Sequence, residues 1–119
     1  MQQRFELDTG AMGEHTAELY LRMRGWAILA RNFKCRFGEI DIIAENASFI
    51  AFVEVKTRAK NALVSGEEAV DLRKQSRLTV TAELYLSQNP SNLQPRFDVV
   101  IVERDGREFR VVNYIENAF

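Results

Sequence analysis

The chain is poor in cysteine and histidine, and this shortage excludes two kinds of site. Cys35 is the only cysteine and His15 the only histidine among its 119 residues. A disulfide framework needs paired cysteines, and a zinc site usually needs several cysteine or histidine ligands, so we expect neither. The phosphate-binding pattern G-x-x-x-x-G-K-[ST] is also absent. Acidic and basic side chains are therefore the candidates for chemistry.

Long apolar runs are missing as well. No run approaches the ~18 residues of a membrane-spanning helix. Residues 1–10 lack the apolar segment that a signal peptide requires. We therefore expect a cytoplasmic protein that has no membrane partner.

Neither sign of charge dominates the composition. The 16 basic and 17 acidic residues give a net charge of −1, so binding to nucleic acid would have to come from local patches. Three stretches contain basic residues and no acid: 31–36, 56–60 and 73–77. Such stretches are usually solvated faces, so none of them indicates a function by itself.

The length suits one compact domain, and we expect residues 10–119 to form it, after a short arm over residues 1–9. Helical spacing of apolar residues predicts a first helix over 10–24. The pattern Ser65-x-x-Glu68 has the form of a capping box, which predicts a second helix from there to about residue 87. Five strands are predicted over residues 26–34, 38–44, 49–57, 96–102 and 108–114. The order α-β-β-β-α-β-β favours an α/β fold with a central mixed sheet flanked by helices.

Two of the predicted strands carry charge beside residues that should be buried. If the hairpin loop spans residues 46–49, Glu45 pairs with Ile50, and the same register sets Asp41 opposite Glu54. Opposed side chains of an antiparallel pair lie ~5 Å apart at Cβ, so two carboxylates repel unless a cation lies between them. Lys56 could supply that charge, but Mg²⁺ suits the pair better because it takes one or two carboxylates together with phosphate.

Other interpretations of these acids remain open. Glu54 and Lys56 could form an ion-pair ladder at a wet sheet edge, although the apolar residues around them predict burial, where unpaired charge is costly. Glu14 lies on the core-facing stripe of the first predicted helix and could reach the sheet. It could equally begin that helix and face water. Glu39 shares a strand face with Asp41 and is a weaker candidate.

The spacing of these residues resembles a known nuclease signature. Asp41, followed after twelve residues by Glu54-Val55-Lys56, is similar to the PD-(D/E)xK motif, with Ile40 in place of the proline. The closer resemblance is to the YraN family of uncharacterised bacterial proteins, and it covers about residues 13–103. The motifs that carry it are Gly13-Glu14, the segment 25–32, GEIDIIA at 38–44, FVEVKTR at 52–58, Lys74 and Arg96-Phe97-Asp98.

This resemblance implies a restriction-endonuclease-like fold, similar to that of archaeal Holliday-junction resolvases. It matches Asp41, Glu54 and Glu14 to metal-binding acids and Lys56 to the catalytic lysine. It also sets Lys74 in the long helix, where related nucleases carry a lysine or glutamine near the site. The implied activity is that of an endonuclease that uses Mg²⁺ or Mn²⁺ to cut DNA, including branched or structured DNA.

The positions of three basic residues suggest how nucleic acid would be held. Arg58 and Lys60 are expected on the loop after the third strand, where they and Lys74 would contact phosphates flanking the cut. A homodimer is also expected, because related resolvases act as dimers. Its interface could use apolar residues of the last strand, namely Phe109, Val111 and Tyr114.

Two other classes of function stay open at this point. The chain could be a nucleic-acid-binding module that keeps the nuclease fold, acts with a partner and has little activity of its own. It could also be a structural domain with a vestigial acid cluster. Retention of Glu14, Asp41, Glu54 and Lys56 together argues against the vestigial reading.

Overall fold

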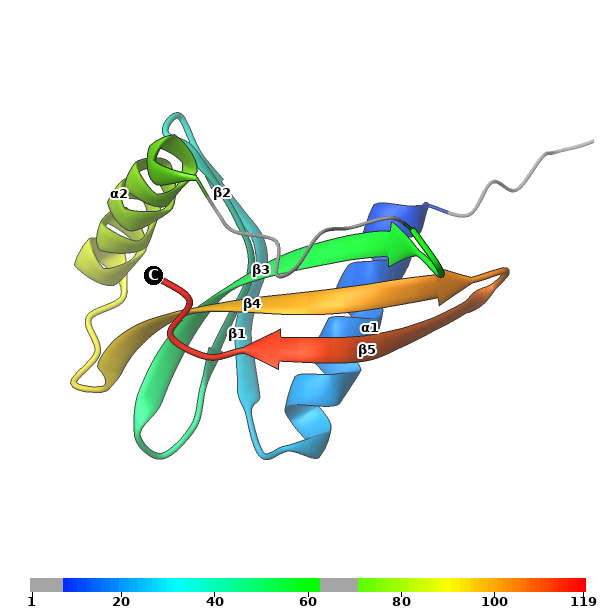
Figure 1. The fold of residues 1–119 in the computed structure, drawn as a ribbon. Coiled ribbons are helices and arrows are strands. Elements are labelled where there is room, and N and C mark those ends of the chain that lie inside the picture. Colours follow the sequence, from blue (N-terminus) through cyan, green and yellow to red (C-terminus); the bar gives the residue numbers. More distant parts are fainter. Residues whose placement is uncertain (1–7, 63–70) are drawn as a thin grey trace, which may run out of the picture.

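A computed structural model describes residues 8–62 and 71–119 of the chain. The elements follow one another in the predicted order, α-β-β-β-α-β-β (Figure 1). They are α1 (Thr9–Met23), β1 (Ala27–Cys35), β2 (Gly38–Glu45), β3 (Phe49–Ala59), α2 (Leu72–Gln88), β4 (Gln94–Asp105) and β5 (Glu108–Ile115). Among the described residues, neither helix is both long and apolar enough to span a membrane.

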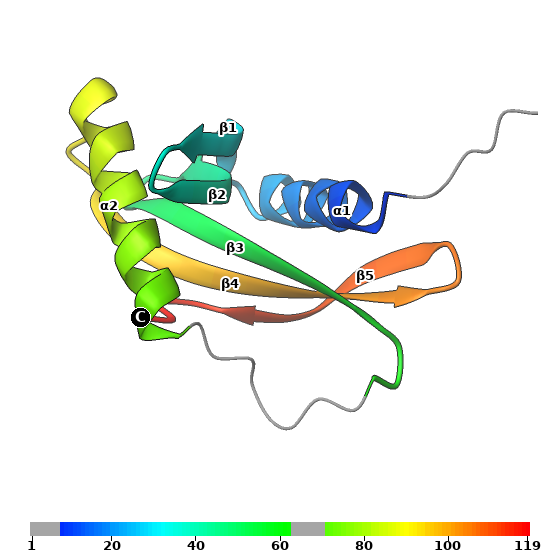
Figure 2. The ribbon, with the colours of Figure 1, turned by 90° about the horizontal axis from the view of Figure 1, so that it is seen from above.

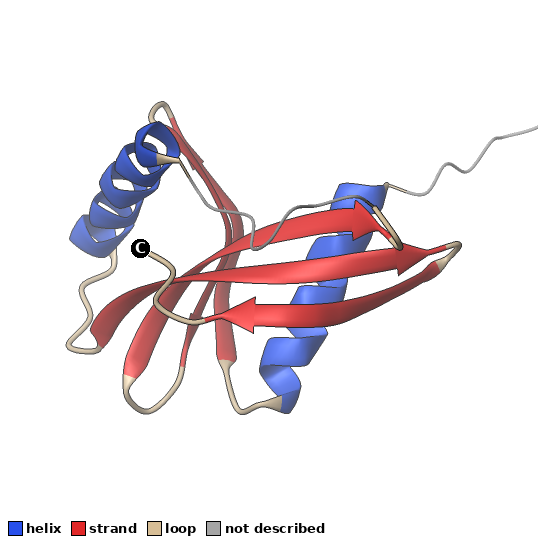
Figure 3. Ribbon diagram, in the orientation of Figure 1, coloured by secondary structure: helices blue, strands red, loops and turns tan. Residues whose placement is uncertain are grey.

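The strands form one mixed sheet in the spatial order β1-β2-β3-β4-β5 (Figure 3). Only β3 and β4 run parallel, because the connection between them crosses over through α2. The other neighbours are antiparallel, and the β2–β3 hairpin has the predicted register, with Glu45 paired to Ile50. The mixed α/β architecture predicted from the pattern is therefore confirmed.

The two helices cover different parts of the sheet (Figure 2). Beneath α2 lies a cluster of Ile40, Ile43, Ile50, Phe52, Leu78, Ala82, Tyr85, Val99 and Ile101. Beneath α1 lies a second cluster of Ala17, Leu21, Ile42, Ala44, Ala51, Val53, Val100 and Val102. Alternate residues of β3 enter the two clusters, which explains its continuous apolar run. By the same alternation, Glu54 falls on the α2 face and Val55 on the α1 face.

The start of α2 is fixed by Asp71. Its Oδ1 accepts a hydrogen bond from the backbone N–H of Lys74 at 2.8 Å, and the helix begins at Leu72. The predicted capping box at Ser65-x-x-Glu68 lies outside the described residues. At the other end the helix stops at Gln88, close to the predicted position.

The Arg96-Phe97-Asp98 motif has a structural role in this fold. Asp98 is fully buried and accepts two hydrogen bonds of 2.9 Å from Arg96 and one of 2.6 Å from the Tyr114 hydroxyl. It also accepts the backbone N–H of Asn117 at 3.0 Å. A buried carboxylate needs such partners, and the network ties the segment after β5 to β4.

The residues predicted to form a dimer interface on the last strand are wrong, because they are not exposed. Phe109, Val111 and Tyr114 are half-buried and pack against the cluster beneath α1. Val111 pairs with Val102 and Tyr114 with Val100, and both partners belong to that cluster. Val112 is the exposed apolar residue of β5, at 39%. The homodimer itself stays a prediction.

Candidate active site

The sheet forks where β2 and β3 part. Their pairing ends at Ile42 and Val53, and beyond that point β2 stays paired with β1 while β3 stays paired with β4. Asp41 and Glu54 are the first residues past the fork. They continue the predicted register, but they face each other across an opening and are not ladder partners.

The backbone of β2 turns at the same place. Ile40 belongs to the cluster beneath α2, whereas Ile42 belongs to the cluster beneath α1. Residues two apart on a regular strand share one face, so the strand rotates at Asp41. On β1, Asn32 lies between the residues that pair with Ile40 and Ile42, and it has a left-handed φ of 53°, which asparagine tolerates better than most residues. The rotation aims the Asp41 side chain into the fork.

Asp41 is held there by the neighbouring strand. Its Oδ2 accepts a hydrogen bond from the backbone N–H of Val55 at 2.8 Å. Burial raises the pKa of Asp41 to about 7; the Val55 hydrogen bond opposes this shift, and the carboxylates of Glu54, Glu14 and Glu39 add to it. The site therefore concentrates negative charge around a buried carboxyl group.

Lys74 brings a positive charge from α2 into the same place. Its Nζ donates to Oε1 of Glu54, forming an ion pair within the cleft. The cleft has a volume of about 580 Å³ and opens between the fork and the first turns of α2. It is lined by Gly38, Glu39, Asp41, Glu54, Asp71, Arg73, Lys74, Arg77 and Leu78.

Glu14 approaches the fork from α1, on the other face of the sheet. Its side chain is only 17% exposed and forms a 3.5 Å ion pair with Arg31 of β1, so it does not simply face water at the helix start. The close approach of α1 depends on Gly13, where an added Cβ would lie 1.9 Å from the Thr57 hydroxyl oxygen. Glu14 is near enough to raise the pKa of Asp41.

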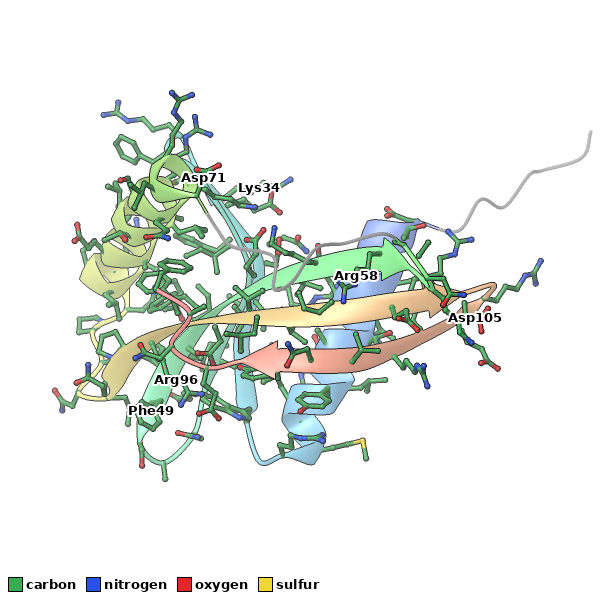
Figure 4. The ribbon with its side chains drawn as sticks, in the orientation of Figure 1. Lys34, Phe49, Arg58, Asp71, Arg96 and Asp105 are labelled. Atoms are coloured by element: carbon green, nitrogen blue, oxygen red, sulfur yellow. The ribbon has the colours of Figure 1, made fainter. Side chains whose placement is uncertain are left out.

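Among the described residues, those that line the cleft do not include Lys56, Arg58 or Lys60. Lys56 is partly buried and lies two residues beyond Glu54 on the same face of β3. Arg58 was expected on a loop, but β3 continues to Ala59 and so includes it. Lys60 turns away from the cleft and pairs with Asp105 at 3.3 Å, at the far tip of the sheet (Figure 4).

Sequence reasoning missed three residues that line the cleft: Asp71, Arg73 and Arg77. The spacing of apolar residues in the helix did indicate the position of the neighbouring Lys74. Lys74 lies four residues before Leu78, which lies four before Ala82, so Lys74 continues the buried stripe of α2 by one turn. The two arginines flank it within the basic stretch 73–77.

The donor set suits a hard cation. Among residues 8–62 and 71–119, no three carboxylate, histidine or cysteine side chains are gathered into a ready metal cage. Asp41 and Glu54 nevertheless supply two carboxylates at one opening. Mg²⁺ commonly takes one or two carboxylates and keeps several waters, whereas zinc prefers nitrogen and sulfur ligands. The residues therefore fit a magnesium-type ion.

The family model and the relatives that match this chain all belong to one family. The sequence model of the uncharacterised protein family UPF0102 matches residues 13–102. A UPF0102 protein of Synechococcus sp. (strain JA-3-3Ab) is 41% identical, over 94% of this chain and 90% of the relative. A relative from Caldanaerobacter subterraneus is 43% identical, over 92% of this chain and 93% of the relative. One from Clostridium acetobutylicum is 41% identical, over 98% of this chain and 97% of the relative. These names state no activity.

Proposed function

This chain belongs to the UPF0102 family, and from that premise we propose that it is a metal-dependent nuclease that hydrolyses phosphodiester bonds in DNA. The observation that carries the proposal is the fork of the sheet. There Asp41 and Glu54 meet at one opening, beside basic residues of α2. A cation and a phosphate would both be stabilised by this combination of charges.

Asp41 and Glu54 would hold Mg²⁺ or Mn²⁺, with the carbonyl oxygen of Val55 as a further ligand. Glu14 would complete this site or help to hold a second ion. When bound, the metal supplies an activated water and neutralises charge on the phosphate. The buried position of Asp41 supports this role, because an ionised carboxylate there is destabilised unless a cation accompanies it.

The basic residues would act on water and phosphate. Lys56 would orient or deprotonate the attacking water, or neutralise the charge that develops in the transition state. Lys74 now neutralises Glu54. If a bound cation neutralises Glu54 instead, the ammonium group of Lys74 would be available to bind a phosphate oxygen. Arg73 and Arg77 are exposed on the same cleft and would hold flanking phosphates.

One observation favours a second candidate function, a nucleic-acid-binding module with little activity. Lys74 forms an ion pair with Glu54. If that ion pair persists on substrate, the cleft would bind phosphate and would not cut it. The two functions differ in a direct assay.

The assay uses the purified full chain with Mg²⁺ or Mn²⁺ and labelled DNA in four forms: a four-way junction, a flap, a duplex and single strands. Asp41→Asn is the test variant. Asp105→Asn is the matched control, because Asp105 pairs with Lys60 at the far tip of the sheet. Cleavage by the parent and the control, but not by Asp41→Asn, supports the nuclease. Binding without cleavage of any form supports the module.

A further inference from the structure

The hairpin between β1 and β2 ends in an exposed aromatic residue beside the cleft. Arg36 and Phe37 are the two residues between the end of β1 and the start of β2. Phe37 is 41% exposed, and the Arg36 guanidinium lies 4.7 Å from the centroid of its ring. Phe37 belongs to neither of the two core clusters. Its ring is therefore accessible to a ligand.

Phe37 forms one wall of a small hollow. The hollow has a volume of about 350 Å³, and its other walls are Arg36, Ser76, Arg77 and Val80. Arg77 also lines the cleft that contains Asp41 and Glu54. The hollow and the cleft thus adjoin across one arginine side chain, so a single strand of nucleic acid could occupy both.

The hairpin tip is fixed against α2. The backbone N–H of Phe37 donates to the Cys35 sulfur at 3.4 Å, and the Cys35 thiol donates to the Thr81 hydroxyl at 3.6 Å. At Gly38 an added Cβ would lie 3.2 Å from that same hydroxyl oxygen. A surface that is already ordered loses little entropy on binding, so the ring is held ready for a ligand.

The charge around the hollow suits phosphate. Its exposed cations, together with those on the neighbouring rim of the cleft, are Arg36, Arg73 and Arg77. Of the nearby acids, Glu39 lies opposite Lys34 in the β1–β2 register, and Asp71 accepts the capping hydrogen bond of α2. Arginine side chains with an aromatic ring are the usual combination for an unpaired nucleotide, since the ring stacks on the base and the guanidinium groups bind the backbone.

We propose that this hollow is a base-stacking subsite, in which Phe37 stacks on an unpaired base of a DNA strand that also occupies the cleft. Arg36 and Arg77 bind the phosphates on either side of that base. Bases inside a duplex are stacked on each other and cannot reach the ring. The inference rests on the proposed function and narrows its substrate class to DNA with an unpaired segment near the cut.

The distance along β2 sets where that segment should lie. Phe37 precedes Asp41 by four residues, which span about 13 Å of strand at ~3.3 Å per residue. Duplex DNA rises ~3.4 Å per nucleotide, so the unpaired base is expected about four nucleotides or fewer from the scissile phosphate. Flaps, junctions and single-stranded extensions meet this condition.

The test measures binding in EDTA, which prevents cleavage. Fluorescence anisotropy compares a fully paired duplex with the same duplex carrying a single-stranded extension. Stacking of one base is worth ~1–3 kcal/mol, so Phe37→Ala should weaken binding of the extended DNA roughly 5- to 150-fold. The paired duplex should change less than about twofold, because phosphate contacts dominate its binding. Phe37→Trp should retain the preference.

A second readout reports on stacking itself. A 2-aminopurine base in the extension should lose fluorescence when the parent binds and keep it when Phe37→Ala binds. Met23→Ala is the matched control, because Met23 is an apolar residue 83% exposed on α1. Circular dichroism of each variant establishes that it is folded.

The outcomes separate this inference from the proposed function. If the parent binds both DNAs and Phe37→Ala weakens neither, or weakens both equally, the stacking subsite is wrong and the nuclease proposal is untouched. If the parent binds neither DNA at low salt, the stacking subsite is wrong, and the cleavage assay with Mg²⁺ tests the nuclease separately. Selective loss on the extended DNA, with loss of 2-aminopurine quenching, supports the subsite.

Discussion

The carboxylate of Asp41 accepts a hydrogen bond from the backbone N–H of Val55 at 2.8 Å, across the opening where β2 and β3 part. The side chain therefore takes over a role that the backbone of β2 would have in a continued ladder. It also fixes one carboxylate beside the strand that carries Glu54.

The first expectation is a pH-dependent gain in stability from Asp41→Asn. The pKa of Asp41 is raised from 3.8 to about 7. A raised pKa stabilises the fold at low pH, and that contribution is lost as the pH rises through the folded-state value. Each pKa unit is worth ~1.4 kcal/mol. When the pH is raised from about 4 to about 8, the free energy of unfolding of the variant should therefore increase relative to that of the parent by on the order of 2–4 kcal/mol.

Urea unfolding of both proteins in EDTA measures this difference. Asparagine can still accept the Val55 hydrogen bond through its carbonyl oxygen, so the geometry of the fork is kept. A gain of the same size at both pH values would mean that ionisation of Asp41 is not its cause.

A second expectation follows for divalent cations. Mg²⁺ bound at the fork would stabilise the folded parent by mass action. Its melting temperature should therefore rise with Mg²⁺ at alkaline pH, while that of Asp41→Asn should stay constant. Asp105→Asn, with its carboxamide at the far tip of the sheet, should respond as the parent does. An equal rise in all three proteins would point to general salt effects.

The third expectation concerns Lys56. Lys56→Ala should reduce cleavage by about 10²- to 10⁴-fold, the range for loss of one general acid or base. Metal binding and DNA binding should remain close to those of the parent, because Asp41 and Glu54 are intact. Single-turnover cleavage and anisotropy measure the two properties separately. Unchanged cleavage would remove Lys56 from the mechanism.

Lys74 should behave differently, since it competes with a cation for Glu54. Removal of its charge by Lys74→Met should tighten Mg²⁺ binding by up to about fivefold, as expected for a partly exposed ion pair of up to ~1 kcal/mol. DNA binding should become weaker in the same variant. Isothermal titration with Mg²⁺ gives the affinity, and Lys60→Met serves as the lysine control. Weaker Mg²⁺ binding would contradict the competition.

The packing of α1 offers a test that does not need activity. Gly13→Ala places a Cβ 1.9 Å from the Thr57 hydroxyl oxygen, so the helix must move and stability should fall by ~1–3 kcal/mol. Thr57→Ala should restore part of that loss in the double variant. Gly10→Ala is the control, because its Cβ would meet only Asp8 at 3.5 Å, and alanine favours the helix by up to ~1 kcal/mol.

The sequence predicted that Asp41 and Glu54 lie close together, because strand alternation is a local property, but it did not predict that the strands part there. The register that pairs Glu45 with Ile50 follows from a short loop, and it brings Asp41 and Glu54 together. Other features depend on choices that local rules leave open. Ser65 and Asp71 both suit a helix start, and Asp71 caps α2 in the fold.

Contacts between distant elements account for the other differences. Whether Lys74 reaches Glu54 depends on where α2 crosses the sheet, which no spacing along the helix determines. The apolar residues of β5 suit an interface as well as a core, and only the position of α1 assigns Phe109 to the core. Lys60 follows the end of β3 and pairs with Asp105 at the tip of the sheet, a contact that the sequence alone does not indicate.

The hydrogen bond across the fork also limits how many oxygens of Asp41 can bind a cation. Because Oδ2 of Asp41 accepts the Val55 N–H, Oδ1 is the carboxylate oxygen better placed to bind a cation. We therefore expect one-oxygen coordination by this residue. Six-coordinate ions such as Mg²⁺ accept that arrangement, whereas Ca²⁺ often draws both oxygens of a carboxylate at longer range. Ca²⁺ should thus occupy the fork in a different geometry and should not replace Mg²⁺ in cleavage.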